Sequence, residues 1–273
     1  MAIFCIAFII LSWTYDQPYL QYVQEKQYPI TWCIFPFYMA AYPILSVFYI
    51  GIVYINADVP FMQHPNMYQV IRCGRSRWII GQIGGILVRS FAAVLVSAIA
   101  SLLPFIGHIE FGTRWGKIAK TLASQGMENN FGFDEKVNLD FRFFYEIMNK
   151  QTPVGLMLHT ILICTLICTF LGLLMFDLSL YFSKMIAVAG ALSAVIALFI
   201  VQNTYGEWKL RIAHFVPTYW AEIALSATRV SGRYRMPPLT YIYCALALCT
   251  VILIFLIYWK IQRVEFVWEN EDM

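Results

Sequence analysis

Residues Pro60–Gln82, PFMQHPNMYQVIRCGRSRWIIGQ, form the one compact run of basic residues in the chain, and a long apolar segment lies on either side. Arg72, Arg75 and Arg77 place three fixed positive charges within six residues. Trp78 follows at once, and tryptophan is enriched where a chain enters a membrane. The stretch therefore predicts a short basic link between two membrane-embedded segments.

The same link has the signals of a short amphipathic helix. His64-Pro65-Asn66 can start it, and Gly74 can end it because glycine tolerates the left-handed conformation just past a helix end. Met67, Val70 and Ile71 would share one face. Anchoring at lipid headgroups would explain the charges, but it does not explain the apolar face. We therefore expect the link to contact another subunit on the cytosolic side.

Composition predicts an integral membrane protein. Hydrophobic residues make up 60% of the chain and charged residues 13%, with a mean hydropathy of +0.64. One soluble core of 273 residues cannot bury that much apolar surface. The net charge of +3 is too small to indicate nucleic-acid binding. The seven cysteines form no CxxC or Cys/His metal spacing and most lie in apolar runs, so we expect packing roles and no metal or cofactor on this chain.

Six apolar runs predict an all-α fold, a single transmembrane domain over residues 1–273. A bilayer core about 30 Å thick needs about 20 apolar residues at 1.5 Å each, and five runs reach that length. Ala2–Trp13 is short, and we favour a truncated or late-starting helix over a signal peptide because no basic region precedes it and no cleavage signal follows. The predicted helices are 2–13, 30–57, 79–108, 152–176, 185–205 and 237–259, with the link at 60–82.

The segments between these runs give further expectations. Tyr15–Tyr28 is a polar connection, and Asp177–Lys184 is a short link that makes the flanking helices antiparallel neighbours. Two short helices on the membrane surface are expected at Arg114–Ser124 and Leu139–Asn149. Tyr219–Val230, in an aromatic-rich region, is expected to be an interfacial or re-entrant helix.

Pro36, Pro43 and Arg89 are candidate pathway residues. The two prolines are expected to kink one helix, which fits either a pathway-lining helix or ordinary prolines whose freed carbonyls are satisfied by neighbours, the reading we favour. Arg89 falls about two turns into its helix, where its side chain can extend to the near membrane surface or contact a substrate. We favour the first role for Arg89.

Ser97, Ser101 and His159 complete the candidate pathway or interface residues. The two serines continue a stripe of small residues that begins with Gly81, Gly84 and Gly85 and would let another helix approach closely. His159 could be a proton-relay or ligand residue, but a hydrogen-bonded core or pore-lining histidine is favoured because its helix offers no acidic partner.

No energy source is visible on the chain itself. Gly112–Ile118, GTRWGKI, has three residues between its glycines and no Ser or Thr after the lysine, so it is not a phosphate-binding loop. No Asp or Glu interrupts the predicted spans, whereas ion-coupled transporters usually bury carboxylates there. The same absence disfavours a hydrolase with acid/base residues inside the bilayer. The sequence therefore favours a transporter driven by an external motor.

Six helices with the basic link YQVIRCGRSRW between the second and third resemble the membrane subunit of an ATP-binding-cassette (ABC) transporter of the type-2, exporter-like class. The segment HFVPTYWAEIAL before the last helix resembles the outer re-entrant hairpin of that family. The resemblance covers most of the chain as a pattern. The amphipathic helix and basic residues that usually precede the first span in this family are missing here.

The resemblance implies a multi-pass permease in a bacterial plasma membrane that is not itself an enzyme. Its partners would be cytosolic ATPase subunits, which hold ATP and Mg²⁺, a second permease copy or homologue, and membrane lipids. Its cargo would be a hydrophobic, peptide or drug-like substrate. The alternatives are a membrane sensor or assembly partner and, less favoured, an ion-coupled secondary transporter. The link would be the coupling helix that contacts the ATPase, through Met67, Tyr68, Val70, Ile71, Arg72, Arg75 and Arg77.

The distribution of positive charge opposes this orientation. With the link in the cytoplasm, that side holds seven Lys and Arg and the other side holds twelve. We give more weight to the density of charge in the link, because long loops cross membranes with less regard to charge.

Overall fold

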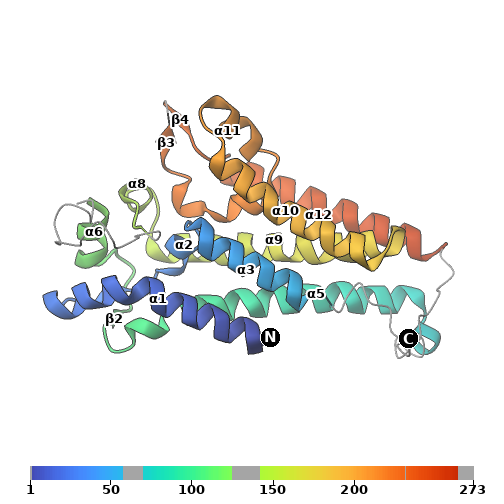
Figure 1. Cartoon of the computed structure of the whole chain (residues 1–273), viewed down its shortest axis with the longest axis horizontal. Helices are drawn as coiled ribbons and strands as arrows, with labels where there is room; N and C mark the ends of the chain where they lie inside the picture. The colour runs from blue at the N-terminus through green and yellow to red at the C-terminus, as the bar shows by residue number, and fades with distance from the viewer. Residues whose placement is uncertain (1, 58–69, 125–141, 231, 264–273) are drawn as a thin grey trace.

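The computed structural model describes residues 2–57, 70–124, 142–230 and 232–263, and its long helices lie side by side along one axis (Figure 1). The prediction of a mostly helical fold is confirmed. Within the described ranges, five helices are long and apolar enough to cross a membrane. They are α1 (Ala2–Lys26), α5 (Arg75–Ala100), α9 (Pro153–Tyr181), α10 (Lys184–Asn203) and α12 (Leu239–Ile261).

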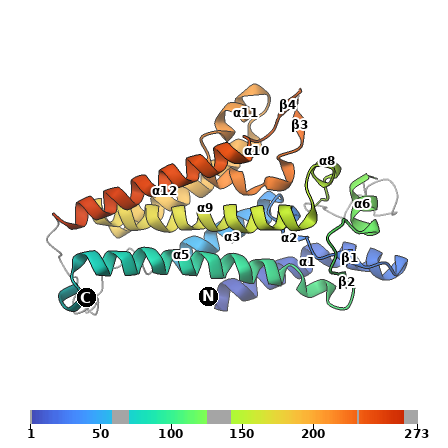
Figure 2. The ribbon, with the colours of Figure 1, turned by 180° about the vertical axis from the view of Figure 1, so that it is seen from behind.

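Helix α9 is the centre of the bundle. It packs against α5, α10 and α12, and Figure 2 shows it between α5 and α12. In its most apolar stretch 67% of the residues are buried, against 44% or fewer in the other four helices. Pro153 occupies its first turn, and Thr152 Oγ1 accepts a hydrogen bond from the Gly155 amide at 3.2 Å. These starting signals and its uniformly apolar sequence suit a helix that is surrounded by others.

A glycine allows α9 to approach α5 closely. A Cβ on Gly172 would lie 2.6 Å from Ile86 Cγ2 and 3.3 Å from the side chain of Asn56, which is too close for a normal contact. By contrast, a Cβ on Gly81 or Gly84 would meet no atom within 4 Å. The first two glycines of the predicted small-residue stripe of α5 therefore face open space in this chain.

Helix α1 is much longer than predicted. The expectations of a helix ending at Trp13 and of a polar connection over Tyr15–Tyr28 are wrong, because the helix continues through Pro18 to Lys26. Tyr19 and Tyr22 are buried, and the Tyr19 ring lies 5.9 Å from that of Phe143. Burial of aromatic rings against distant segments stabilises helix where the local sequence looked like a connection.

The predicted single helix over residues 30–57 is also wrong. This region contains β1 (Ile30–Thr31), α2 (Phe35–Tyr38) and α3 (Tyr42–Ile55). Pro36 lies in the first turn of α2 and Pro43 in the first turn of α3. Backbone N–H groups in the first turn of a helix form no hydrogen bond within the helix, so proline, which has no N–H, is tolerated there. The prolines therefore start two helices instead of kinking one. The 14 residues of α3 span about 21 Å.

The segment after α5 forms small elements at one end of the bundle. A 3₁₀ turn, η1 (Leu103–Phe105), leads into β2 (Ile109–Glu110), which pairs in parallel with β1. Helices α6 (Lys117–Ser124) and α8 (Tyr145–Met148) are shorter than the predicted 114–124 and 139–149, and residues 139–141 lie outside the described part. Ile118 and Leu122 in α6 are buried, as is Trp115 just before it, so these residues face the protein.

The aromatic-rich region before α12 is not an α-helix over Tyr219–Val230, as predicted. After α11 (Glu207–Ala213), Pro217 begins the short 3₁₀ helix η2 (Pro217–Ala221), and Glu222 leaves helical geometry with a ψ of 46°. The elements that follow are η3 (Ile223–Leu225), β3 (Arg229–Val230) and β4 (Arg233–Tyr234), with β3 and β4 pairing antiparallel.

The predicted link over Asp177–Lys184 is mostly helix. Helix α9 reaches Tyr181, and Ser183 Oγ accepts from the Ile186 amide at the start of α10. The two helices run side by side in opposite directions, as expected for a link this short (Figures 1 and 2).

The bundle has two different ends. The start of α5, the end of α12 and the turn between α9 and α10 meet at one end, which we call the basic end (Figure 1). At the opposite end lie α6, α8 and the β1–β2 pair, and α11 with the β3–β4 hairpin projects nearby, above the start of α12.

Candidate functional site

The predicted coupling link ends at the basic end. Residues 70–73 are helical, and the chain leaves the helix at Gly74, whose φ of +76° suits glycine. Val70 packs partly against the apolar cluster at the start of α5, whereas Ile71 is 68% exposed and Arg72 is exposed. Met67 and Tyr68, also predicted to belong to the site, lie outside the described residues.

Arg75 joins the link to the far end of the chain. Its Nη1 donates to the backbone oxygen of Ile261 at 3.2 Å and to that of Gln262 at 3.4 Å. A second hydrogen bond joins the same two segments, from Gln262 Nε2 to Ser76 Oγ at 3.4 Å. The guanidinium therefore satisfies carbonyls that the last turn of α12 leaves without helical partners. Arg77 is exposed.

Further cations surround this contact. Lys260 Nζ lies 4.7 Å from the ring centre of Tyr181, and the Arg263 guanidinium lies 4.4 Å from that of Trp259. Both are cation–π distances, which hold the charges against aromatic rings at the helix ends. The basic end thus combines charge from the link with charge from α12.

The predicted pathway residues are not brought together. Arg89 Nε donates to the backbone oxygen of Gly85, one turn nearer the basic end, at 3.2 Å. His159 Nδ1 lies 2.9 Å from Tyr243 Oη on α12. Ser97 and Ser101 are fully buried, and Ser101 Oγ donates to the Ala98 oxygen at 2.8 Å. These contacts fit an arginine extending toward the membrane surface and a hydrogen-bonded histidine, the two roles favoured from the sequence.

No Asp or Glu interrupts the predicted spans, but two buried carboxylates lie in helices that extend beyond those spans. Asp16 is fully buried in α1 beside Tyr38, whose hydroxyl donates to the Ser12 backbone oxygen at 3.1 Å. Asp177, in α9, is 7% exposed. Asp16 was missed because the first helix was expected to end at Trp13. Asp177 was missed because the helix that contains it was expected to end at Phe176, the residue before it.

A third buried carboxylate, Glu222, belongs to a polar network. Gln202 Nε2 donates to Glu222 Oε1, and Arg235 donates to Gln202 Oε1 at 3.2 Å and to Tyr219 Oη at 3.0 Å. Lys209 Nζ donates to the Gln202 backbone oxygen at 3.3 Å. Burial raises the pKa of Glu222 to about 8, although Arg235, Gln202 and Lys209 act to lower it. The network connects α10, α11, η2 and Arg235, the residue that follows β4.

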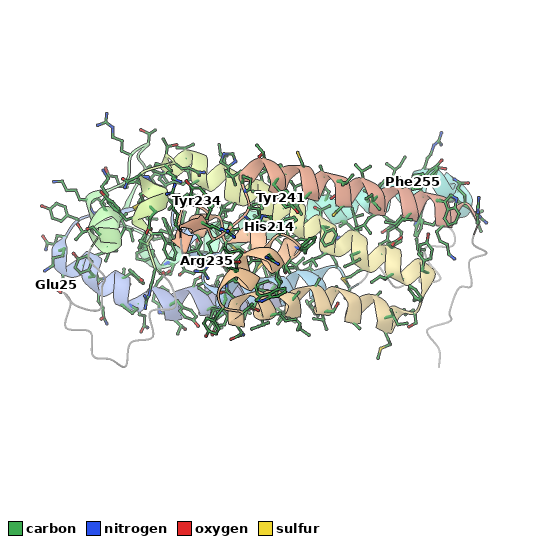
Figure 3. All side chains as sticks on the ribbon, turned by 90° about the horizontal axis from the view of Figure 1, so that it is seen from above. Glu25, His214, Tyr234, Arg235, Tyr241 and Phe255 are labelled. Atoms are coloured by element: carbon green, nitrogen blue, oxygen red, sulfur yellow. The ribbon has the colours of Figure 1, made fainter. Side chains whose placement is uncertain are left out.

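A groove of about 880 Å³ opens between α8, α11, the β3–β4 hairpin and the start of α12. Its lining includes Tyr234, His214 and Tyr241, which lie close together in Figure 3. The groove was not predicted from the sequence, since its walls come from segments far apart in the chain. The one local signal is the alternation of arginines with an aromatic residue in RVSGRYR, residues 229–235.

Comparisons with known proteins identify no family: no protein-family model, curated protein or solved structure matches this chain.

Proposed function

We propose that this chain is the permease subunit of an ABC transporter that exports a hydrophobic, peptide or drug-like substrate across a bacterial plasma membrane. ATP and Mg²⁺ would bind to separate ATPase subunits, and a second permease copy or homologue would complete the pathway. Helix α3, assisted by α2, would be a sixth and short crossing beside the five long helices. The link and the end of α12 would then share the cytoplasmic side.

The observation that carries this proposal is the connection of the link to two helices at once. Ile71 and Arg72 are exposed, while Arg75 holds the end of α12 from the start of α5. Helices α5 and α12 both pack on α9. A partner that displaces the link would therefore move α5 and α12 together against the centre of the bundle.

Such a movement fits the way in which motors drive membrane domains. Closure of two ATPase subunits on ATP would shift the link as a lever, and the helices would rock as rigid bodies. No phosphate-binding loop is evident in the sequence, so in this proposal the energy of ATP would enter through contacts with a partner.

Copurification from native membranes tests the proposal. A tagged full-length chain should bring down a nucleotide-binding ATPase, identified by mass spectrometry. The double variant Ile71→Asp, Arg72→Glu should release it, because both side chains are exposed and their replacement leaves the bundle intact. Lys120→Glu, an exposed cation at the opposite end, is the matched control and should retain the ATPase. If no ATPase is found with the unaltered chain, the proposal fails.

The orientation has its own test. Cys73 is exposed, as is Cys244 in α12, so a variant with Cys244→Ser reports on the link. An impermeant thiol reagent should label Cys73 only after the cells are permeabilised. Ready labelling of intact cells would contradict a cytoplasmic link.

Ion-coupled secondary transport is the second candidate, because Asp16 and Asp177 lie in helices long enough to span a membrane. A buried carboxylate in a span is a common binding group for a driving proton or sodium ion. If this function is correct, transport in vesicles should proceed without ATP, collapse with a protonophore or sodium ionophore, and be lost in Asp16→Asn. ATP-dependent transport that survives both treatments would exclude it.

A further inference from the structure

The groove between α8, α11, the β3–β4 hairpin and the start of α12 combines a large apolar surface with positive charge. Its volume of about 880 Å³ is typical of a site for a small organic ligand. Ile147, Ala227 and Met236 are buried apolar residues in its lining, and Phe215 is 82% exposed at its edge. An apolar ligand body would therefore cover surface that is otherwise open to solvent.

One wall of the groove is held rigidly. Tyr241 Oη donates to the backbone oxygen of His214 at 3.0 Å, and the two rings meet at 66° with centres 5.5 Å apart. The Trp220 ring packs against the Tyr241 ring, with ring centres 5.9 Å apart. Trp220 Nε1 donates to the backbone oxygen of Ala213 at 2.7 Å. The wall is thus formed before any ligand binds, which lowers the entropy cost of binding.

Two cations meet on Tyr234, a lining residue of the groove: Lys150, which also lines it, and Arg229 in β3. Lys150 Nζ and Arg229 Nη2 both donate to Tyr234 Oη, at 3.0 Å and 2.9 Å, and both lie against its ring. In the described part of the chain, neither has a carboxylate partner. Their hydrogen bonds lower the pKa of Tyr234 to about 8. Two like charges held on one neutral oxygen make a place where an anion is favoured.

The remaining charges of the groove leave this excess in place. Arg233 lies 3.6 Å from Glu207, so these two lining residues offset each other. Arg211, also in the lining, lies over the Trp208 ring at 5.4 Å and adds a further positive charge. The groove therefore has a net positive edge.

The position of the groove favours a ligand with one polar and one apolar end. It lies where α12 begins and close to the start of α9, at the limit of two apolar helices (Figures 1 and 3). Leu239 and Tyr241 line it on the side of α12. Lys150, just after α8, and Tyr234 in the β3–β4 hairpin line it on the other side. Apolar and charged surfaces thus follow the polarity of a membrane boundary.

We infer that this groove binds an anionic amphiphile, a molecule with one phosphate or carboxylate group and an apolar chain. The anionic group is held by Lys150 and Arg229, Arg211 adds positive charge elsewhere in the lining, and the chain lies along the wall of His214, Tyr241 and Met236. A small inorganic anion would leave the apolar wall uncovered, and an uncharged lipid would leave the cations unmatched.

Binding to the purified full-length chain in an uncharged detergent tests this assignment. The probes are a monoacylglycerol phosphate and the matched monoacylglycerol without phosphate, measured by native mass spectrometry and equilibrium dialysis. The phosphate probe should bind at least about ten-fold more tightly, the size of one charge-assisted hydrogen bond. The double variant Lys150→Gln, Arg229→Gln should lose roughly ten-fold in affinity for the phosphate probe and keep its affinity for the uncharged one.

Lys120→Gln is the matched control, since Lys120 is an exposed cation outside the groove. A thermal unfolding curve shared by all variants shows that folding is unaffected, and Arg211→Gln replaces the double variant if that one does not fold. Lipid extraction identifies the source: an anionic phospholipid that copurifies and is lost in the double variant is a resident lipid, whereas binding of the added probe alone indicates a free amphiphile. Either result supports the assignment. Equal binding of both probes, no binding, an equal loss in Lys120→Gln, or preference for an acidic peptide would overturn it.

Discussion

Replacing Glu222 by glutamine removes the one titrating carboxylate in the network of Gln202, Arg235 and Tyr219. The side chain is fully buried, and its pKa is raised from 4.5 to about 8 because burial disfavours the charged form. Glutamine has nearly the same shape and can still accept the hydrogen bond from Gln202. The substitution therefore tests the charge with little change in packing.

The sign of the pH dependence follows from this pKa. Between pH 4.5 and 8 the folded protein keeps a proton on Glu222 that the unfolded chain releases, so the stability associated with this group is present below pH 4.5 and is lost as the pH rises toward 8. The slope reaches about 1.4 kcal/mol per pH unit, which amounts to roughly 2 to 3 kcal/mol between about pH 5.5 and 7.5. Glu222→Gln should remove this loss and be the more stable protein at pH 7.5.

The assay is denaturant unfolding in detergent, followed by tryptophan fluorescence at several pH values. Subtracting the Glu222→Gln curve from that of the unaltered chain isolates the carboxylate from other titrating groups. Glu207→Gln is the control, because Glu207 is exposed and its pair with Arg233 lies at the surface. Parallel pH curves for the two proteins, or a lower stability of Glu222→Gln at pH 7.5, would refute the reasoning.

Three further predictions concern helix packing, a helix end and a hydrogen bond between two helices. Gly172→Ala should lower the free energy of unfolding by about 1–3 kcal/mol because its methyl group overlaps α5, whereas Gly81→Ala, in open space, should be neutral or stabilising by up to about 1 kcal/mol; denaturant titration compares the pair. Arg75→Ala should speed amide hydrogen exchange in the last turn of α12 by about ten-fold, which corresponds to a loss of about 1 kcal/mol or slightly more, while α9 stays protected. Unchanged exchange would contradict a stabilising role for the hydrogen bonds of Arg75 to α12. Tyr243→Phe should cost about 1 kcal/mol by leaving His159 without its partner, and an unchanged imidazole nitrogen NMR signal would argue against that hydrogen bond.

Long apolar helices could be predicted from the sequence because length and composition alone determine whether a segment can cross a bilayer. The predicted 185–205 and 237–259 differ from α10 and α12 by two residues or fewer at each end. The extension of the first predicted helix and the break in the second could not be found this way. A proline in an apolar run can kink one helix or start another, and only the fold around Pro36 and Pro43 decides between them.

The candidate sites also differ in whether their residues are adjacent in the sequence or brought together by the fold. The basic link was visible because its charges are adjacent in sequence, but the partner of Arg75 lies 186 residues away and has no sequence signature. The Glu222 network and the groove each combine several segments, and a short 3₁₀ element holds Glu222 where an α-helix was expected. Contacts of this kind depend on tertiary packing, which periodicity does not report.

The buried carboxylates change the argument about energy without reversing it. A carboxylate that binds a driving ion in an ion-coupled transporter belongs near the bilayer midplane, at a point reached from both sides in turn. Asp177 is one turn from the end of α9, at the basic end, whereas Asp16 packs against α2 toward the opposite end (Figure 1). The two carboxylates therefore do not form one central site. The described end of the link, where Ile71 and Arg72 are exposed and Arg75 at the start of α5 contacts α12, is the better-placed entry point for energy, and for this reason we propose an ATPase-driven permease ahead of an ion-coupled one.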